Sequence, residues 1–281
     1  MSSMKLIVMP LILLAGLLSA QEESDWQVLF NGKDLTGWIP KFAGSDLGVN
    51  YHHTFRVEDG LLTVSYDEWT DFHDEFGHLF YNQSFSYYIL ELEYRFRGNQ
   101  VPGGPGWAFR NNGTMLHCQD PKTMTKNQDF PISLEGQLLG GDGVHDRPTQ
   151  NVCTPGTNIY FTDDLIKRHC TNSTSDTYHG DQWVKASYIV LGDSLIEHQV
   201  NGVTVMSYHH PTIDGSGIDP ALSSLFHDGM PVDHGYISLQ AESHPTQFRN
   251  IRILDLTGCK DPSAKNYKSY AVKSDPSSCR Y

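Results

Sequence analysis

The sequence predicts an all-β protein in which two antiparallel sheets pack face to face as a jelly-roll sandwich. Aromatic residues make up 11% of the chain, which also holds 25 glycines and 14 prolines, a composition that suits many short strands joined by turns. Several segments alternate apolar and polar residues with a period of two, and no long window after residue 20 has the 3.6-residue period of an amphipathic helix. A chain of 281 residues is long enough to bury a sizeable core.

The expected strands are read in chain order from this alternation and from the turn residues between the runs. Each segment either alternates strictly or is interrupted by a glycine-containing turn such as Asp59-Gly60 or Asn201-Gly202. The segments are residues 28–38 (two short runs), 54–66 (a hairpin), 85–98 (one long half-buried strand), 183–208 (three strands) and 235–256 (two strands). Strands this numerous, with no helices between them, favour a two-sheet sandwich.

The N-terminus has the pattern of a secretory signal peptide over residues 1–20. Its one charge, Lys5, precedes an apolar run from Leu6 to Leu18, which is shorter than a comfortable membrane span. We therefore expect cleavage after Ala20, no membrane span, and a secreted or periplasmic bacterial protein. A buried N-terminal helix is the alternative, and the polar residues 21–25 count against it.

All five cysteines follow this segment, and an exported protein meets oxidising conditions. Loop proximity pairs Cys153 with Cys170 and Cys259 with Cys279, and leaves Cys118 as a free thiol. The second pair bounds a polar segment, and we expect residues 258–281 to form a disulfide-tied appendage that resembles the tail repeats of secreted bacterial proteins. Its side chains Asp261, Asn266 and Asp275 offer ligands for a cation or caps for turns.

Charge and missing motifs exclude several function classes. The formal net charge is −13 and no run of basic residues stands out, so binding to nucleic acid is not expected. The chain has no P-loop, no Gly-x-Gly-x-x-Gly before a helix and no Gly-x-Ser-x-Gly elbow.

Five segments, in the same order, resemble blocks of the 3-keto-disaccharide hydrolase domain family, which is also described as 3-keto-glucoside 1,2-lyase and 3-keto-2-hydroxy-glucal hydratase. They are residues 26–38, 55–64, 104–117, 130–141 and 235–253. The resemblance implies a concanavalin A-like jelly roll over residues 25–256, with a carbohydrate site on the concave sheet. The chain departs from a typical member at residues 66–78, which are rich in Asp, His and Glu, and at residues 153–182, which carry two cysteines.

The resemblance also implies an oligosaccharide or glycoside substrate that has been oxidised at C3, with a sugar 3-dehydrogenase as a candidate partner enzyme. A 3-keto group acidifies the hydrogen on C2, so a base removes it and the anomeric substituent leaves by elimination between C1 and C2. Water then adds to the glycal, which completes a net hydrolysis. Such a site needs a base, a hydrogen-bonding or positive group for the enolate, and an acid for the leaving oxygen.

Two expected strands present polar rows that fit such a site. Glu135 and Gln137 share one face of a strand while Leu134 and Leu138 face the other way. A second strand repeats the arrangement, with Gln240, Glu242 and His244 opposed by Leu239 and Ala241. A face washed by solvent gives the same alternation, and this alternative stays open.

The expected site combines these rows with residues of the matching blocks. We assign catalytic roles to Glu135, His244, Arg110 and His117, and substrate binding to Trp107, Gln137, Gln240, Glu242 and His78. Arg110 would follow an aromatic strand, Trp107–Phe109, and its alternative is a surface salt bridge. Trp107 would stack on a sugar or else pack in the core, and each histidine has a structural alternative.

No cofactor is indicated with certainty, although a divalent cation is an option. The segment 71–78 gathers carboxylates and imidazoles, without the spacing of a strong metal motif. Such a cation would polarise the 3-keto oxygen. Two other functions are kept beside cleavage of 3-keto-glycosides: a non-catalytic glycan-binding module, because fold does not fix function, and a conventional jelly-roll glycosidase, which needs a second carboxylate.

Overall fold

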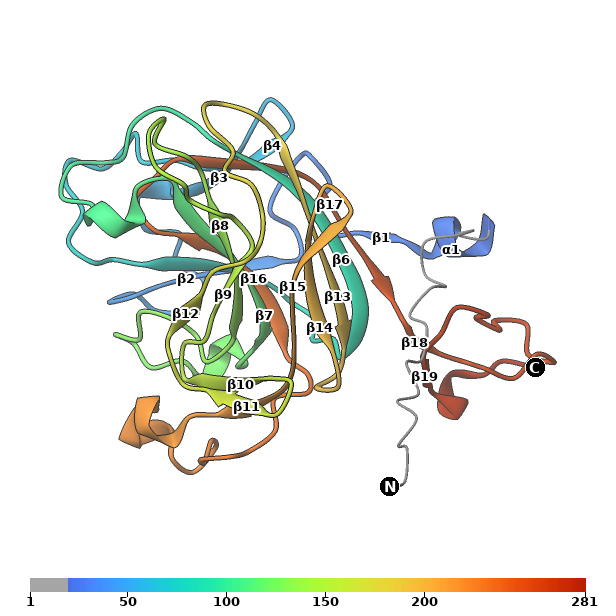
Figure 1. Cartoon of the computed structure of the whole chain (residues 1–281). Coiled ribbons are helices and arrows are strands. Elements are labelled where there is room, and N and C mark those ends of the chain that lie inside the picture. The colour runs from blue at the N-terminus through green and yellow to red at the C-terminus, as the bar shows by residue number, and fades with distance from the viewer. Residues whose placement is uncertain (1–19) are drawn as a thin grey trace, which may run out of the picture.

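The structure of the chain, a computed structural model, describes residues 20–281. It consists of two antiparallel sheets that face each other across one core, as the sequence predicts (Figure 1). The expected signal peptide lies outside the described residues except for Ala20, which begins the short helix α1 (Ala20–Asp25). No helix among residues 20–281 is long and apolar enough to cross a membrane.

One sheet has ten strands. Its strand order is β11-β10-β15-β14-β13-β6-β17-β4-β3, and β1 pairs with β17 beside this path. The bounds in that order are Asp164–Ile166, Thr157–Phe161, Val203–Ile213, Ile196–Val200, Val184–Leu191, Tyr87–Phe96, Thr246–Asp255, Leu61–Val64 and Phe55–Glu58, with β1 at Gln27–Val28.

The other sheet has seven strands and carries most of the expected site residues. Its order is β12-β9-β8-β7-β16-β5-β2. The bounds in that order are Cys170–Thr171, Asn151–Cys153, Leu134–Leu139, Asn111–Cys118, Tyr236–Ala241, Gly77–Tyr81 and Trp38–Phe42.

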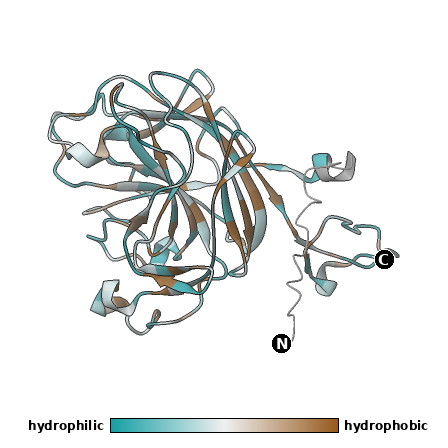
Figure 2. Cartoon of the chain, viewed as in Figure 1, coloured by the Kyte–Doolittle hydropathy of each residue, from teal (hydrophilic) through white to brown (hydrophobic). Residues whose placement is uncertain are grey.

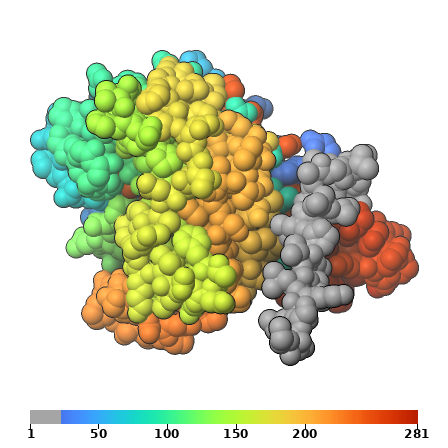
Figure 3. Space-filling model, in the orientation of Figure 1, coloured from blue at the N-terminus to red at the C-terminus, as the bar shows by residue number. Residues whose placement is uncertain are grey.

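Short 3₁₀ turns and a small C-terminal segment complete the chain. The turns are η1 (Tyr51–His53), η2 (Gly106–Ala108), η3 (Pro121–Thr123), η4 (Gly215–Gly217), η5 (Pro220–Leu222) and η6 (Pro276–Ser278). The C-terminal segment pairs β18 (Thr257–Gly258) with β19 (Lys273–Ser274) and lies to one side of the sandwich (Figures 1 and 3).

The period of two in the sequence corresponds to alternate burial of the side chains along β6. Leu90, Leu92 and Tyr94 are buried in the core, and the glutamates between them face outward. Glu91 forms an ion pair of 2.8 Å with Arg252, and Glu93 forms one of 2.6 Å with Arg249 on the neighbouring β17. Hydrophobic residues accordingly concentrate on the strands in Figure 2.

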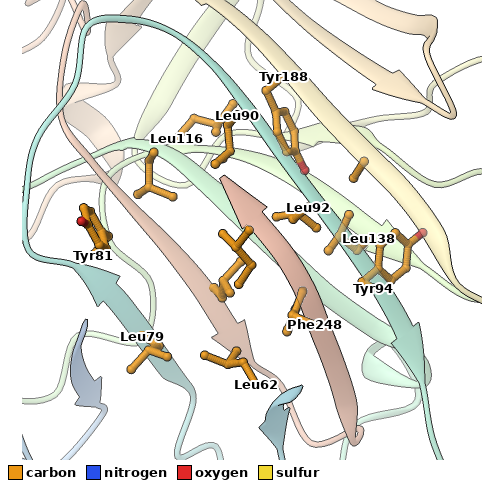
Figure 4. Close-up of a cluster of buried hydrophobic side chains, with 14 of the residues drawn as sticks. Leu62, Leu79, Tyr81, Leu90, Leu92, Tyr94, Leu116, Leu138, Tyr188 and Phe248 are labelled. Carbon is orange, nitrogen blue, oxygen red and sulfur yellow. The ribbon is translucent and has the colours of Figure 1, made fainter. Parts of the chain in front are cut away.

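The core fills the space between the two sheets (Figure 4). Leu134 and Leu138 of β8 point into it, as expected, and so do Leu239 and Ala241 of β16. Tyr188 of the opposite sheet packs beneath Gly136, where a Cβ atom would overlap its ring. Burial of alternate residues of β8 in this core turns Glu135 and Gln137 to the other face of the sheet.

The cysteine pairing matches the expectation. Cys153 is bonded to Cys170 and Cys259 to Cys279, while Cys118 is free and buried. In the C-terminal segment the expected cation ligands act as hydrogen-bonding caps. The Asp261 carboxylate accepts from Ser263 and Tyr281, the Asp275 carboxylate from Ser277, and the Asn266 amide oxygen from the backbone of Arg280.

One predicted strand is wrong. Trp107–Phe109 does not form the strand expected before Arg110, because residues 106–108 form the 3₁₀ turn η2 and β7 begins only at Asn111. The preceding sequence, Val-Pro-Gly-Gly-Pro-Gly, supplies two prolines and three glycines that interrupt strand pairing.

Gly136→Ala should destabilise the protein by about 1–3 kcal/mol, because the added methyl group must displace the buried ring of Tyr188. Gly106→Ala is the matched control, since a Cβ atom there meets no atom within 4 Å and is expected to change stability by no more than about 0.5 kcal/mol. Urea unfolding measures both. Equal stability of the two variants would contradict the packing described between Gly136 and Tyr188.

Candidate functional site

A pocket of about 360 Å³ lies on the outer face of the seven-stranded sheet, the face turned away from the core. Its residues on strands are Asn111, Glu135, Gln137 and Cys153, and Glu242 directly follows β16. Loops between the strands add Trp107, Phe130, Pro155 and His169, and Cys170 closes one end. Polar side chains from several strands therefore meet in one hollow, and Trp107, with 55% of its surface exposed, stands at its edge.

Gly113 on β7 makes room for the polar side chains of the two flanking strands. It is opposite Gln137 of β8 in the strand register, and Gln240 of β16 lies on its other side. A Cβ atom at this position would overlap both Gln240 Oε1 and Glu135 Oε1. The lack of a side chain on the middle strand thus lets side chains from β8 and β16 approach each other above it.

Glu135 and Glu242 form a pair of buried carboxyl groups in this pocket. Glu135 is 5% exposed and Glu242 is 2% exposed. Burial raises the pKa of Glu135 well above its ordinary value, the nearby charge of Glu242 raises it further, and the Gln240 amide acts in the opposite direction. Burial also raises the pKa of Glu242 to about 8. Both raised pKa values favour the protonated forms at neutral pH, so each carboxyl group can act as an acid and, once ionised, as a stronger base than an ordinary carboxylate.

Amide side chains surround these carboxyl groups. The oxygen of Gln137 accepts a 2.9 Å hydrogen bond from Asn151 Nδ2, so its NH₂ group remains as the donor on the pocket side. Asn111 Oδ1 and Glu242 Oε2 are buried without a hydrogen-bond partner among the described residues. Buried polar atoms of this kind in a pocket are available to a ligand.

Aromatic rings form one wall of the pocket. Trp107 stacks on Phe76, with 5.8 Å between the ring centroids, and Phe76 contacts Phe130 at 5.0 Å. Phe130 in turn packs against the ring of His78 at 5.7 Å. This series holds Trp107 in place and leaves much of its surface free.

His78 lies on the outer face but behind this wall. It is opposite Gln240 in the strand register, and its Nε2 atom is hydrogen-bonded to the carbonyl of Asp129 at 3.0 Å. Burial lowers its pKa to about 3, so the ring is neutral at physiological pH. It packs against Phe130 and is not among the residues that line the pocket.

His244 and Arg110 do not line the pocket either, although both were expected there as catalytic residues. Strand β16 ends at Ala241, and Ser243 has a φ of +84°, so the alternation that placed His244 beside Glu242 does not continue through it. Burial and the charges of Arg110 and Arg147 lower the pKa of His244 to about 4.

Arg110 directly precedes β7, and its side chain connects two loops beside the start of this strand. Its guanidinium donates to the carbonyl of Gly180 at 2.9 Å and to that of Gly141 at 3.3 Å. His244 sits close to it, edge-on to the rings of Phe109 and Phe96. The structure thus groups these two residues with each other and with Arg147, next to the carboxyl pocket and not inside it.

His117 is the fourth expected catalytic residue, and its ring is far from this chemistry. Its Nε2 atom is hydrogen-bonded to the carbonyl of Gly192 at 3.1 Å, and its ring packs edge-on against Tyr88. Both partners belong to the ten-stranded sheet or its turns. The side chain therefore serves the packing between the sheets, and we withdraw a catalytic role for it.

The segment 71–78 does not assemble a cation site. Among residues 20–281, the one group of three metal-capable side chains with converging ligand atoms is Cys153, His169 and Cys170. Both sulfur atoms of that group are already bonded to each other in a disulfide. His73 instead lies near the carboxylates of Asp71 and Glu75 on an exposed surface.

Sequence reasoning missed several residues that line the pocket, among them Asn111, Phe130, Pro155 and His169. Asn111 is two residues from Gly113 on the same strand face, so alternation could have found it. The others come from loops, whose reach over a sheet has no periodic signal. Cys153 and Cys170 were the one feature of the sequence that drew attention to the segment containing His169.

Comparison of the sequence with known families gives one match. The model of a family described as 3-keto-alpha-glucoside-1,2-lyase-like domain matches residues 25–254. No curated protein matches the chain significantly.

Solved structures of low sequence identity share the fold. A protein of unknown function with a galectin-like fold from Bacillus subtilis has a TM-score of 0.51 at 12% identity, over 82% of this chain and 94% of that one. A proposed glycosyl hydrolase from Parabacteroides distasonis has a TM-score of 0.49 at 19% identity, over 85% of this chain and 98% of that one.

The carboxyl pair should make the folded protein less stable as the pH rises from 6.5 to 8. A carboxyl group whose pKa is raised on folding keeps a proton at pH values where the unfolded chain has lost it. Its contribution to the free energy of unfolding is therefore complete at low pH, and it is lost as the pH rises through the pKa of the folded state. The loss is at most about 1.4 kcal/mol per pH unit for each carboxyl group. The buried histidines have the opposite pH dependence. Because their pKa values are lowered on folding, they destabilise the folded protein only as the pH falls below about 6.5.

Denaturant unfolding at several pH values measures this slope. Glu242→Gln should flatten it, whereas Glu68→Gln, on an exposed side chain, should leave it unchanged. A wild-type stability that is constant or rises between pH 6.5 and 8 would contradict the protonated pair.

Proposed function

The chain belongs to the family of 3-keto-alpha-glucoside-1,2-lyase-like domains, and on that premise we propose that it cleaves 3-keto-glycosides by elimination between C1 and C2, followed by hydration. The family supports a carbohydrate-active role in general. The observation that carries the specific reaction is the pair of buried carboxyl groups, Glu135 and Glu242, in a pocket edged by an exposed tryptophan.

The first step requires a base of suitable strength. A carbonyl group at C3 acidifies the hydrogen on C2, and a carboxylate with a raised pKa is a stronger base than an ordinary one. The ionised member of the pair takes the C2 proton, and the electron pair of the C2–H bond becomes the enolate. Removal of solvent from the pocket strengthens this proton transfer.

The second step requires an acid and a donor for negative charge. The protonated member of the pair gives its proton to the glycosidic oxygen as the C1–O bond breaks, and the enolate electrons form the C1–C2 double bond. The NH₂ group of Gln137 is placed to donate to the oxygen at C3 while it carries charge. Water then adds across the double bond, with the two carboxyl groups in reversed roles.

The rim of the pocket supplies sugar binding. The exposed ring of Trp107 offers a flat apolar surface to the C–H groups of a sugar, and the rings of Phe76 and Phe130 hold it in that position. Asn111 adds a buried acceptor for a hydroxyl group. These groups orient the substrate above the carboxyl pair.

The proposed reaction depends on an oxidation that occurs before it. The substrate carries a ketone at C3, so a sugar 3-dehydrogenase must act first. Two disulfides are typical of proteins in an oxidising compartment. Together with the N-terminal sequence they support a secreted or periplasmic enzyme that acts on glycosides outside the cytoplasm.

A conventional glycosidase is the second candidate, and one observation favours it. Such an enzyme uses two carboxyl groups across the scissile bond. Glu135 has no second carboxyl group on its own strand, but Glu242, which directly follows β16, provides one in the same pocket. This enzyme would cleave unoxidised glycosides, whereas the proposed elimination requires the ketone, so the choice of substrate separates the two functions.

Glu135→Gln and Glu242→Gln should each lower the turnover of a 3-keto-glucoside by at least about a hundredfold, because each variant removes one member of the acid–base pair. Glycal and reducing-sugar products report the rate. Glu68→Gln, outside the pocket, serves as the control and should keep wild-type activity.

Three outcomes separate the candidate functions. Turnover that persists in both pocket variants would refute the assignment of the pair. Cleavage of unoxidised glycosides at equal or higher rates would favour the glycosidase. Binding of sugars with no cleavage of either substrate would identify a glycan-binding module.

Trp107→Ala should raise KM roughly fivefold, equivalent to about 1 kcal/mol of lost ring contact, with little change in kcat. Trp107→Phe keeps an aromatic surface and should stay close to the wild type. Steady-state kinetics measure both variants. A wild-type KM in Trp107→Ala would show that the sugar does not contact this ring.

A further inference from the structure

A disulfide lies in the wall of the pocket directly beside Glu135. Cys153 of β9 is opposite Glu135 of β8 in the strand register, and Cys170 of β12 is opposite Cys153. The three residues therefore form one row across three strands on the outer face of the sheet. The bond between the two sulfur atoms closes the end of the pocket at which the sheet stops.

The chain just before Cys170 has few other attachments to the seven-stranded sheet, whereas the residues after β12 are hydrogen-bonded to Thr149 and Asn151. β12 has only two residues, and it is the edge strand. Just before it, the chain crosses over from β11 of the ten-stranded sheet. A two-residue edge strand contributes little pairing of its own, so the covalent bond is the main restraint on the residues that precede it.

His169 immediately precedes Cys170 and lines the pocket. One of its ring nitrogens lies within 4.8 Å of both sulfur atoms. Its carbonyl oxygen accepts hydrogen bonds from the backbone N–H of Thr154 at 2.8 Å and from the Thr154 hydroxyl at 3.3 Å. The carbonyl group of His169 is thus held by Thr154, next to the disulfide of Cys170, and the side chain of His169 remains exposed at the pocket.

We infer that His169 is a substrate-binding residue and that the Cys153–Cys170 disulfide holds it at the pocket for that purpose. This inference rests on the proposed function, and it adds a specificity-determining contact at the end of the pocket that the disulfide closes. Partial burial lowers the pKa of His169, so its ring is neutral and presents one N–H donor and one acceptor nitrogen to sugar hydroxyl groups.

The charge of the pocket agrees with a neutral sugar as the ligand. Among residues 20–281, its lining includes Glu135 and Glu242 and no lysine or arginine. A carboxylate or sulfate group on the sugar would meet these carboxyl groups without a cation to balance it. A neutral sugar unit is therefore the class of ligand that His169 would contact.

The experiment compares His169→Ala and His169→Gln with two disulfide variants. We expect His169→Ala to raise KM for a neutral 3-keto-glucoside about tenfold with kcat nearly unchanged, the effect of one lost hydrogen bond to substrate. His169→Gln, which restores a donor and an acceptor, should recover part of the loss. His145→Ala is the control, because His145 is an exposed residue that pairs with Asp142 and does not line the pocket.

The disulfide variants test how His169 is held. Cys153→Ser combined with Cys170→Ser should raise KM as His169→Ala does, whereas Cys259→Ser combined with Cys279→Ser, which removes the other disulfide, should leave KM unchanged. Circular dichroism checks that each variant is folded. Equal KM values for wild type and His169→Ala would overturn the inference, and so would a KM rise in both disulfide variants.

Direct binding separates this inference from the proposed function. In the Glu135→Gln background, calorimetry with the same 3-keto-glucoside measures Kd without turnover. If the wild type does not cleave the sugar but His169→Ala still weakens binding about tenfold, the proposed reaction fails and the binding role stands. If the wild type cleaves and His169→Ala leaves Kd unchanged, only the role of His169 fails.

Discussion

The burial of two neighbouring carboxyl groups, which favours their protonated forms at neutral pH, is the constraint on which the candidate site depends. Glu135 lies on β8 and Glu242 directly follows β16, on the other side of β7, where Gly113 leaves room for the side chains of Glu135 and Gln240. Water does not surround them, so ionising both would be costly. The cost of ionising them raises both pKa values. A group with such a pKa is protonated at neutral pH and can donate its proton, and once ionised it accepts a proton more strongly than an ordinary carboxylate does.

The core beneath the sheet fixes the positions of these groups. Leu134 and Leu138 are buried between the sheets, which forces Glu135 and Gln137 to the outer face. Tyr188 fills the space under Gly136, so β8 cannot shift its register without losing this packing. The loops then complete the pocket: an aromatic wall that ends in Trp107 on one side, and the disulfide-bonded segment with His169 on the other.

The fold and half of the site could be predicted from the sequence because both depend on local alternation. That pattern predicted the long strand at residues 85–98, which the structure has at 87–96, and it placed Glu135, Gln137 and Glu242 on outward faces. It gave the wrong position for His244, since a single residue with positive φ interrupts the alternation. The alternation also gave no sign that the ring of His117 contacts residues of the opposite sheet. Contacts between sheets have no period in the sequence.

Infrared difference spectroscopy of the folded protein at pH 7 tests the protonation of this pair most directly, because protonated and ionised carboxyl groups absorb at different frequencies. The account predicts a protonated-carboxyl band at neutral pH that is reduced in Glu242→Gln and unaffected by replacing an exposed glutamate. A spectrum in which every carboxyl group is ionised at pH 7 would contradict it, because the site would then hold two charges and no acid.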